Sequence, residues 1–160
     1  MRRVVVIGCA GAGKTTLSRA LAARLGVPHV ERDELGELGG DDYRRRVGEV
    51  VAGDAWVFDG APYYVDAVVY PRADTVVALD YARVTVLRRA AWRALQTRRS
   101  SGLRWAWKVW AERRREVAAL DLPHAEIVRL RTPRDARAWL RRLAPGATTS
   151  TRPSARSSRP

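Results

Sequence analysis

The feature that most constrains this chain is a glycine-rich loop near its N-terminus. Residues 8–15 fit the pattern G-x-x-x-x-G-K-[ST] at every fixed position. The β-branched run at residues 4–7 predicts a strand buried on both faces, and leucines at every fourth position after the loop predict an amphipathic helix ending near Gly26. Glycine lets a phosphate approach the backbone, and the helix N-terminus adds N–H donors. The loop therefore predicts a phosphate-binding site, and this strand–helix context argues against a chance glycine turn.

The residue types in the loop suggest ATP and Mg²⁺ as cofactors. Lys14 is expected to reach the β- and γ-phosphates, and the hydroxyl of Thr15 to ligate Mg²⁺. The complete set predicted to contact the nucleotide in this region is Gly8, Gly11, Ala12, Gly13, Lys14, Thr15 and Thr16.

Strands and helices alternate along the rest of the chain. Further strands are predicted at residues 29–31, 55–58, 75–79 and 127–130, with amphipathic helices at residues 43–51, 84–95 and 136–143. Such alternation predicts an α/β fold, an open doubly wound parallel five-stranded sheet with helices on both faces in three layers. We expect one kinase-like domain at residues 1–144 and, from composition, a disordered tail at residues 145–160.

Composition limits the class of protein further. The formal net charge is +13, but only Lys14 and Lys108 among the 30 basic residues are lysines. The single cysteine, Cys9, excludes an intramolecular disulfide framework. No apolar run approaches the ~18 residues of a membrane span, and the opening residues lack the apolar core of a signal peptide. A cytoplasmic location is expected.

Two strand ends carry candidate acids. Asp33 follows the second strand and is expected to orient or deprotonate an acceptor hydroxyl, or to hold Mg²⁺ through water; the alternative is a helix cap. Asp59 and Gly60 end the third strand. Gly60 would let the backbone approach an acceptor and Asp59 could act through Mg²⁺-bound water; the alternative is an ordinary Asp-Gly turn.

The segment from Arg88 to Arg115 holds ten cations and one acid. A mobile arginine-bearing lid at residues 88–115 would clamp the transferring phosphoryl group, and Arg89 and Arg93, one helical turn apart, are its best candidates. The same segment contains Trp105, Trp107 and Trp110, and interleaved arginines and aromatics also suit stacked nucleic-acid bases. A solvated helix face is the third interpretation.

Together these segments resemble a known group of proteins. The loop, Asp33, residues 56–60 with Tyr63, and residues 71–80 look like adenylate-kinase-like P-loop proteins, and most like the bacterial group labelled DNA topology modulation proteins. The resemblance implies a central P-loop strand, ATP, Mg²⁺, an arginine lid and an adenine-facing loop at Thr132 and Pro133. This chain departs from the group at residues 35–40, where an aromatic stretch is usual. Tyr63 also replaces the arginine that would grip a nucleoside monophosphate.

The first hypothesis is a small-molecule or nucleotide kinase-like phosphotransferase, with Lys14, Asp33, Arg89 and Arg93 as its catalytic residues and a small molecule as its acceptor. Two alternatives stay open at this point. One is a basic nucleic-acid-associated P-loop ATPase, and the other is a nucleotide-binding protein without turnover.

Overall fold

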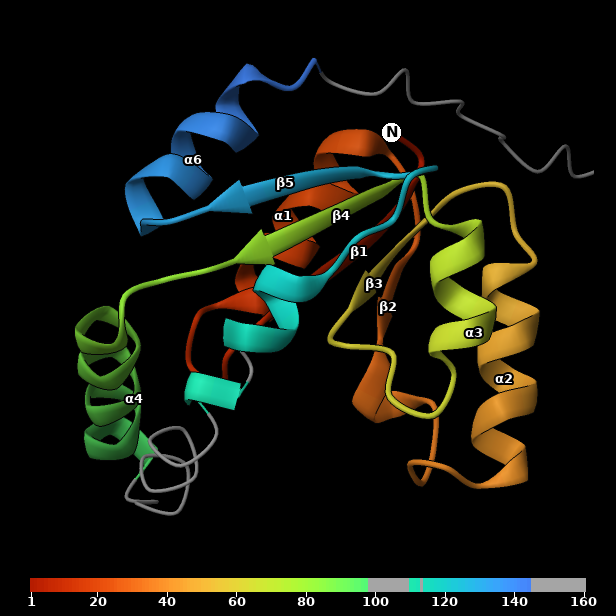
Figure 1. Cartoon of the computed structure of the whole chain (residues 1–160), viewed down its shortest axis with the longest axis horizontal. Coiled ribbons are helices and arrows are strands. Elements are labelled where there is room, and N and C mark those ends of the chain that lie inside the picture. The colour runs from red at the N-terminus through yellow and green to blue at the C-terminus, as the bar shows by residue number, and fades with distance from the viewer. Residues whose placement is uncertain (98–109, 113, 145–160) are drawn as a thin grey trace, which may run out of the picture.

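The protein is a three-layer α/β/α structure around a parallel sheet (Figure 1). The computed structural model describes residues 1–97, 110–112 and 114–144, and for residues 90 and 92–97 it describes the backbone alone. The strands are β1 (Arg3–Gly8), β2 (His29–Glu31), β3 (Trp56–Asp59), β4 (Thr75–Leu79) and β5 (Glu126–Leu130). They pair in the order β2-β3-β1-β4-β5, and every pairing is parallel. The predicted fold class is confirmed.

Strand β1 lies at the centre because its side chains suit burial on both sides. Val4, Val5 and Val6 are fully buried, as the β-branched run predicted, and alternate side chains face opposite layers. The register sets Val6 beside Asp59 of β3 on one side and beside Val77 of β4 on the other. The phosphate loop therefore leaves the sheet between the ends of β3 and β4.

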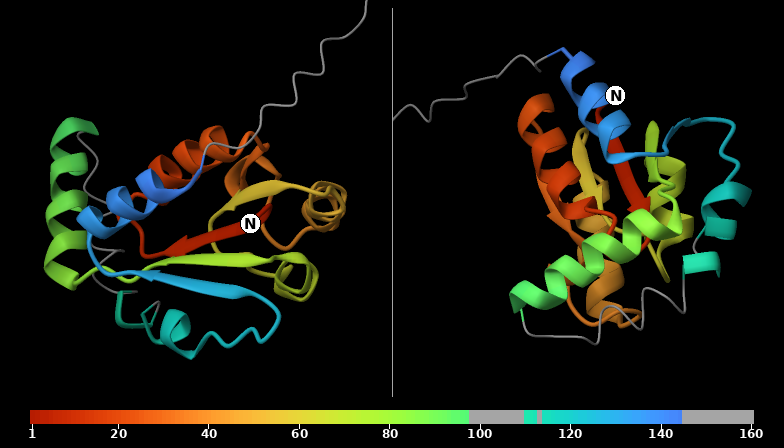
Figure 2. Two further views of the ribbon diagram at one scale, coloured as in Figure 1. Left: turned by 90° about the horizontal axis from the view of Figure 1, so that it is seen from above. Right: turned by 90° about the vertical axis from the view of Figure 1, so that its left-hand side faces the viewer.

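The helices divide between the two faces of the sheet. Helices α1 (Lys14–Leu25) and α6 (Pro133–Arg142) pack on the face that carries Val4, Val6 and Val77. Helices α2 (Asp41–Val51) and α3 (Asp66–Val69) cover the face that carries Val5 and Phe58. Figure 2 shows α1 and α6 side by side on their face. Helix α3 is short and was not predicted.

Helix α4 (Arg83–Thr97) takes a different place from the others. It lies beyond the carboxyl ends of the strands rather than over the middle of the sheet (Figures 1 and 2). A further helical segment, residues 110–112 and 114–119, returns toward the sheet, and Val117 from it is buried in the core on the α2–α3 face. These elements surround the sheet edge where the predicted site residues gather. No helix in the described ranges is long and apolar enough to cross a membrane.

Candidate active site

The phosphate loop is built at a close approach between β1 and β4. Gly8 has φ +147°, and a Cβ placed on it would lie 2.9 Å from both the Cβ and the carbonyl oxygen of Leu79. Any larger residue there would push β4 away, so this glycine is required by packing. Gly13, with φ +92°, caps α1 without a side chain. The first-turn N–H groups of α1 have no intrahelical partner and point toward the loop's hollow.

Between Gly8 and Gly13 a backbone hydrogen bond closes a turn in the loop. Ala12 is buried and its N–H donates to the carbonyl of Cys9 at 3.1 Å, which shapes the turn. Cys9 is buried as well, so its small side chain fills the core under the loop. Thr15 is half-buried and Thr16 exposed at the start of α1. The predicted nucleotide-binding residues from Gly8 to Thr16 thus follow one another through the end of β1, the loop and the start of α1.

Lys14 points back over the loop. Its ammonium Nζ donates to the carbonyl of Cys9 at 3.2 Å. Burial lowers the pKa of Lys14, the negative charge of Asp59 opposes this shift, and the nearby Arg32 guanidinium adds to it. A partly desolvated ammonium with one carbonyl partner can gain contacts from a polyanion such as a nucleotide's phosphates.

Asp59 is the most buried acid at this edge. It ends β3, directly beside Val6 of β1, and is 5% exposed. One carboxylate oxygen, Oδ1, has no hydrogen-bond partner among the described residues, and the other, Oδ2, lies 3.8 Å from Nε2 of His29. A buried carboxylate oxygen without a partner is costly, and such groups in native proteins commonly mark a functional or ion-binding position. The observation favours the Mg²⁺ role of Asp59 over an ordinary turn.

Asp33 lies at the neighbouring strand end and reaches solvent. It belongs to a short 3₁₀ turn, Arg32–Glu34, that follows β2, and its side chain is 71% exposed. Arg32 donates to Oδ1 of Asp33 from Nε at 2.9 Å and from Nη2 at 2.7 Å. The carboxylate is therefore held near the end of β3, accessible to an acceptor.

Arg32 is a site residue that the sequence reasoning missed. Its side chain also donates to the carbonyl of Ala61 at 3.4 Å, packs 3.6 Å from the position a Cβ would take on Gly60, and lies 5.5 Å from the ring centre of Tyr63. It joins the ends of β2 and β3. A signal is present in the sequence, because Arg32 also follows a predicted strand end, directly before Asp33.

The structure describes the side chain of one of the two predicted lid arginines, Arg89. A Cβ placed on Gly13 would lie 2.7 Å from Nη2 of Arg89, so the Arg89 guanidinium rests on the phosphate loop from α4. The backbone of Arg93 lies in the same helix, but its side chain is outside the described part of the structure, as are Trp105 and Trp107 entirely. One of the two predicted arginines is thereby placed at the loop.

The end of the predicted lid segment folds back against the loop. Trp110 donates from Nε1 to the carbonyl of Tyr81 at 3.3 Å, and its own carbonyl lies 3.8 Å from Sγ of Cys9. The guanidiniums of Arg83 and Arg114 lie 5.8 and 5.3 Å from the centre of its ring. Trp110 therefore contacts both the loop and the beginning of α4.

Thr132 and Pro133, predicted to face adenine, begin α6. The Thr132 hydroxyl accepts from the N–H of Asp135 at 3.1 Å, and the Thr132 N–H donates to the Asp135 carboxylate at 2.9 Å, which forms a capping box. The hydroxyl is thus used within the helix start. Thr132 is exposed and Pro133 is half-buried.

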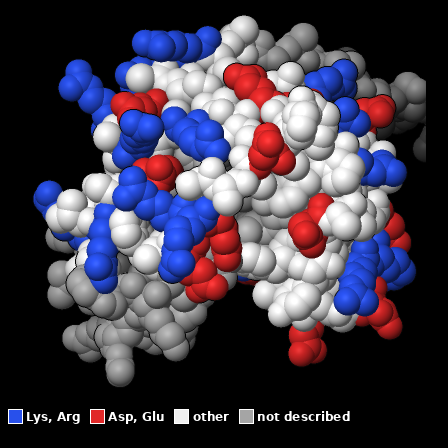
Figure 3. Space-filling view, viewed as in Figure 1, with Lys and Arg blue, Asp and Glu red and all other residues white. Residues whose placement is uncertain are grey.

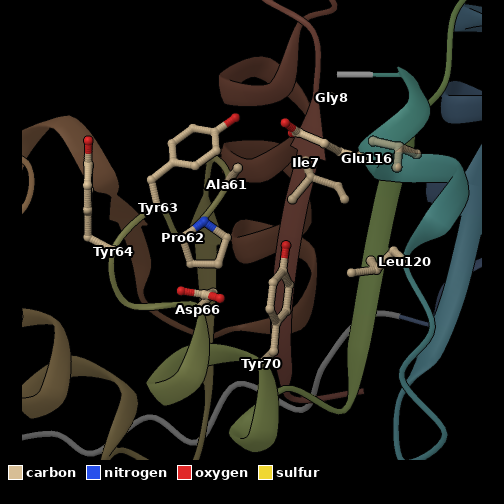
Figure 4. A pocket seen from close by; sticks show the side chains of 11 residues that line it. Ile7, Gly8, Ala61, Pro62, Tyr63, Tyr64, Asp66, Tyr70, Glu116 and Leu120 are labelled. Carbon is tan, nitrogen blue, oxygen red and sulfur yellow. The ribbon is translucent and has the colours of Figure 1, made fainter. Parts of the chain in front are cut away.

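A pocket of about 380 Å³ opens from the loop toward α3 (Figure 4). Gly8 lies at one side of it, and the loop after β3, helix α3 and the segment after residue 114 form the rest. Figure 4 shows Tyr63 and Tyr70 with their hydroxyls pointing toward the Gly8 side. The pocket therefore meets the phosphate loop at Gly8. No cluster of three or more His, Cys, Asp or Glu that could hold a metal occurs in the ranges the structure describes.

Comparison with known proteins supports this architecture. A family model described as an AAA domain matches residues 3–42, and none of the curated proteins matches the chain. A gluconokinase from Sinorhizobium meliloti 1021 is 23% identical with a TM-score of 0.55, over 89% of this chain and 93% of that one. A shikimate kinase from Acinetobacter baumannii, in complex with shikimate, is 21% identical with a TM-score of 0.52, over 88% and 89%. A deoxyadenosine kinase from M. mycoides, with bound dCTP, is 14% identical with a TM-score of 0.55, over 86% and 96%.

The chain has a P-loop kinase-like fold. At these identities the likeness shows the fold alone. The three proteins are kinases named for different acceptors, so the fold leaves the acceptor of this chain open.

Proposed function

We propose that this protein is an ATP-dependent small-molecule kinase that transfers the γ-phosphoryl group to a hydroxyl of its acceptor. The observation that carries the proposal is the position of Gly8, which both begins the phosphate loop and lines the pocket. A phosphate held by the loop and a small molecule held by the pocket would then meet at one point. This shared position is what a direct transfer between two bound substrates requires.

We assign the binding of the ATP phosphates to the loop and α4. The N–H groups at the start of α1 and the Lys14 ammonium would hold the β- and γ-phosphates. Arg89 already rests on Gly13 and would contact the transferring group, where negative charge is spread over the phosphoryl oxygens. Arg93 lies on the same helix, and we propose it as the second lid arginine.

A divalent cation fits the donor set of Thr15 and Asp59. The Asp59 carboxylate has a buried oxygen with no partner among the described residues, at the strand end beside the loop, and a hydrated cation would provide a contact for it. Thr15 lies in the first turn of α1 and would supply its hydroxyl. Bound there with ATP, Mg²⁺ would neutralise charge on the phosphate oxygens.

Asp33 is assigned the acceptor hydroxyl. In the transfer, the acceptor oxygen forms a bond to the γ-phosphorus while the bond from that phosphorus to the β–γ bridging oxygen breaks. The hydroxyl proton passes to the Asp33 carboxylate and ADP leaves. Arg32 holds Asp33 from one side and contacts Gly60 and Ala61, so it acts as a positioning residue between acid and pocket.

The distribution of charge favours this proposal over a nucleic-acid surface. Figure 3 shows acidic side chains among the basic ones on the face it presents, with the basic ones more numerous on the α4 and α6 side and both signs close together on the α2 side. On α2, Arg45 pairs with Asp42 and Glu49, and Arg46 also pairs with Asp42. A surface built for phosphodiester backbones would leave a stripe of arginines without acidic partners.

The proposal extends to the organisation of the chain. We propose that residues 1–144 form one cytoplasmic kinase-like domain followed by a tail at residues 145–160. The motif resemblance supports a relation to the bacterial DNA topology modulation group.

The test is a screen of the full-length protein for ADP formation from Mg·ATP with a panel of hydroxylated metabolites. In the Asp33→Asn variant we expect turnover to fall roughly 10²–10⁴-fold, the usual contribution of a general base, while ATP affinity is kept. Glu34→Gln is the matched control, because Glu34 is the adjacent exposed acid, and it should retain turnover. Tight Mg·ATP binding without acceptor-dependent ADP formation would contradict the kinase assignment.

A further inference from the structure

The lining of the pocket restricts the charge of the molecule it can hold. Among the eleven lining residues of the described structure none is a lysine, arginine or histidine. Two are acids, Asp66 at the start of α3 and Glu116 from the segment after residue 114, and three are tyrosines. Acids and aromatic rings lining a pocket favour hydrogen-bond donors and ring faces over carboxylates and phosphates.

The two acids come from opposite walls. Asp66 lies on α3 below the loop that follows β3, and Glu116 extends into the pocket from the far wall, toward Tyr63 (Figure 4). Both acids are exposed, so water screens their charge, but an anionic group bound between them would still be repelled from both sides. A hydroxyl, amino or imino group would instead donate to these carboxylates.

Tyr70 contributes a neutral hydrogen-bonding group. Burial raises the pKa of Tyr70 to about 12, and the nearby Tyr63, Asp66 and Glu116 add to that shift. The phenol is therefore neutral at physiological pH and can both donate to and accept from a ligand. Its ring and those of Tyr63 and Pro62 supply apolar faces for a flat or cyclic molecule (Figure 4).

Arg32 contacts the lining residues Ala61 and Tyr63 but does not itself line the pocket. Arg32 directs Nε and Nη2 to Asp33 and Nη1 to the carbonyl of Ala61. The carboxylate of Asp33, which the proposed reaction needs, balances the charge of Arg32. Binding an anionic acceptor through Arg32 would compete with that contact and pull the guanidinium away from Asp33.

We propose that the phosphoryl acceptor is a hydroxyl-bearing ring compound without negative charge, rather than a nucleoside monophosphate or a sugar acid. This inference rests on the proposed kinase function. The pocket's volume of about 380 Å³ lies at the small end of the usual ~300–1,000 Å³ for small-molecule sites. A neutral nucleoside and a neutral sugar share the required chemistry.

The experiment compares matched pairs that differ in charge. One arm sets nucleosides against their 3′-monophosphates, which keep the 5′-hydroxyl, and a second sets a neutral sugar against its uronic acid, such as glucose against glucuronate, which keeps the ring. With full-length protein and saturating Mg·ATP, we expect kcat/KM to be at least about tenfold higher for the neutral member of the preferred pair. The arm that shows turnover identifies whether the acceptor is a nucleoside or a sugar. An anionic member that is phosphorylated as well as its neutral partner would overturn the inference.

Charge variants test whether the pocket itself sets this preference. Glu116→Lys should reduce the neutral-to-anionic ratio of kcat/KM about tenfold, because a repelling charge becomes an attracting one. Asp54→Lys is the control, since Asp54 is an exposed acid in the turn before β3 and makes the same change in net charge. If Glu116→Lys unfolds, Glu116→Gln provides a milder change in the same direction. An unaltered ratio in a folded Glu116 variant would also contradict the inference.

Equilibrium binding separates this inference from the kinase proposal. If no compound is phosphorylated, calorimetry with the same pairs measures the pocket directly. Binding of neutral members without turnover would retain the pocket's preference for neutral ligands and remove the kinase function. Turnover of anionic members alone would retain the kinase function and remove the inference. Failure of every neutral member to bind, with or without Mg·ATP, would overturn the inference.

Discussion

Replacing Lys14 by methionine should separate stability from function at the phosphate loop. The ammonium of Lys14 is largely desolvated and has a single hydrogen-bond partner within the described structure, the carbonyl of Cys9 at 3.2 Å. Burial lowers the pKa of Lys14 even though Asp59 opposes the shift. The charged form is therefore less favourable in the folded protein than in the unfolded chain, and Lys14→Met removes that charge while keeping a long flexible side chain.

The expected gain in stability follows from this direction. A lowered pKa means that the unfolded chain binds more protons than the folded one between the folded pKa and the ordinary value of 10.5. Removing the charge should raise the free energy of unfolding at pH 7 by about 1 kcal/mol, a few degrees in Tm for a chain of this size. The wild type gains stability as pH rises through that window, so the advantage of Lys14→Met should shrink toward pH 10.5.

The functional effect should have the opposite sign. A charge-assisted hydrogen bond contributes about 1.5–3 kcal/mol, so Lys14→Met should weaken Mg·ATP binding by roughly 10–100-fold and reduce turnover at least as much. The desolvated ammonium of Lys14 is therefore expected to lower the free energy of unfolding of the free protein. The same ammonium is expected to raise the affinity of the protein for the phosphates of ATP.

Urea denaturation at neutral and alkaline pH, with calorimetry of Mg·ATP binding, measures both effects. Arg19→Met is the control, because Arg19 is an exposed cation on the same helix that pairs with Glu31 at 2.8 Å. It should leave stability unchanged or slightly reduced and should leave ATP binding intact. A Lys14→Met protein less stable than the wild type at pH 7, or with an advantage that does not change with pH, would refute the reasoning.

Three further predictions concern other parts of the site. Asp59→Asn should raise the Mg²⁺ concentration needed for half-maximal ADP formation without loss of Tm, and an unchanged Mg²⁺ titration would remove Asp59 from the metal site. Arg89→Ala should lower kcat by about 10²–10³-fold with little change in the KM for ATP, and an equal loss in affinity would indicate ground-state binding only. Tyr64 has φ +65°, so Tyr64→Val should be about 1 kcal/mol less stable than Tyr64→Asn by urea denaturation; equal stability would show that this backbone angle relaxes.

The sequence by itself determined the class of fold and the phosphate loop. A run of β-branched residues, a glycine-rich loop with Lys14, and leucines at helical spacing are local patterns, and each is read within about twenty residues. The same holds for β4, whose predicted and observed limits coincide at Thr75–Leu79. Helix α3 escaped prediction because four residues, Asp66–Val69, are too few to show a helical period.

Only the tertiary structure decided which side chains share the site. By its sequence Asp59 was open to either a Mg²⁺ role or an ordinary Asp-Gly turn. It is buried because β3 pairs with β1, and its Oδ1 has no hydrogen-bond partner among the residues that the structure describes. Arg89 lies 76 positions after Gly13 in the sequence, and its guanidinium rests on that glycine only because α4 crosses the carboxyl end of the sheet. Parallel pairing brings strand ends from distant segments to one edge, and contacts of that kind have no local pattern from which they could be read.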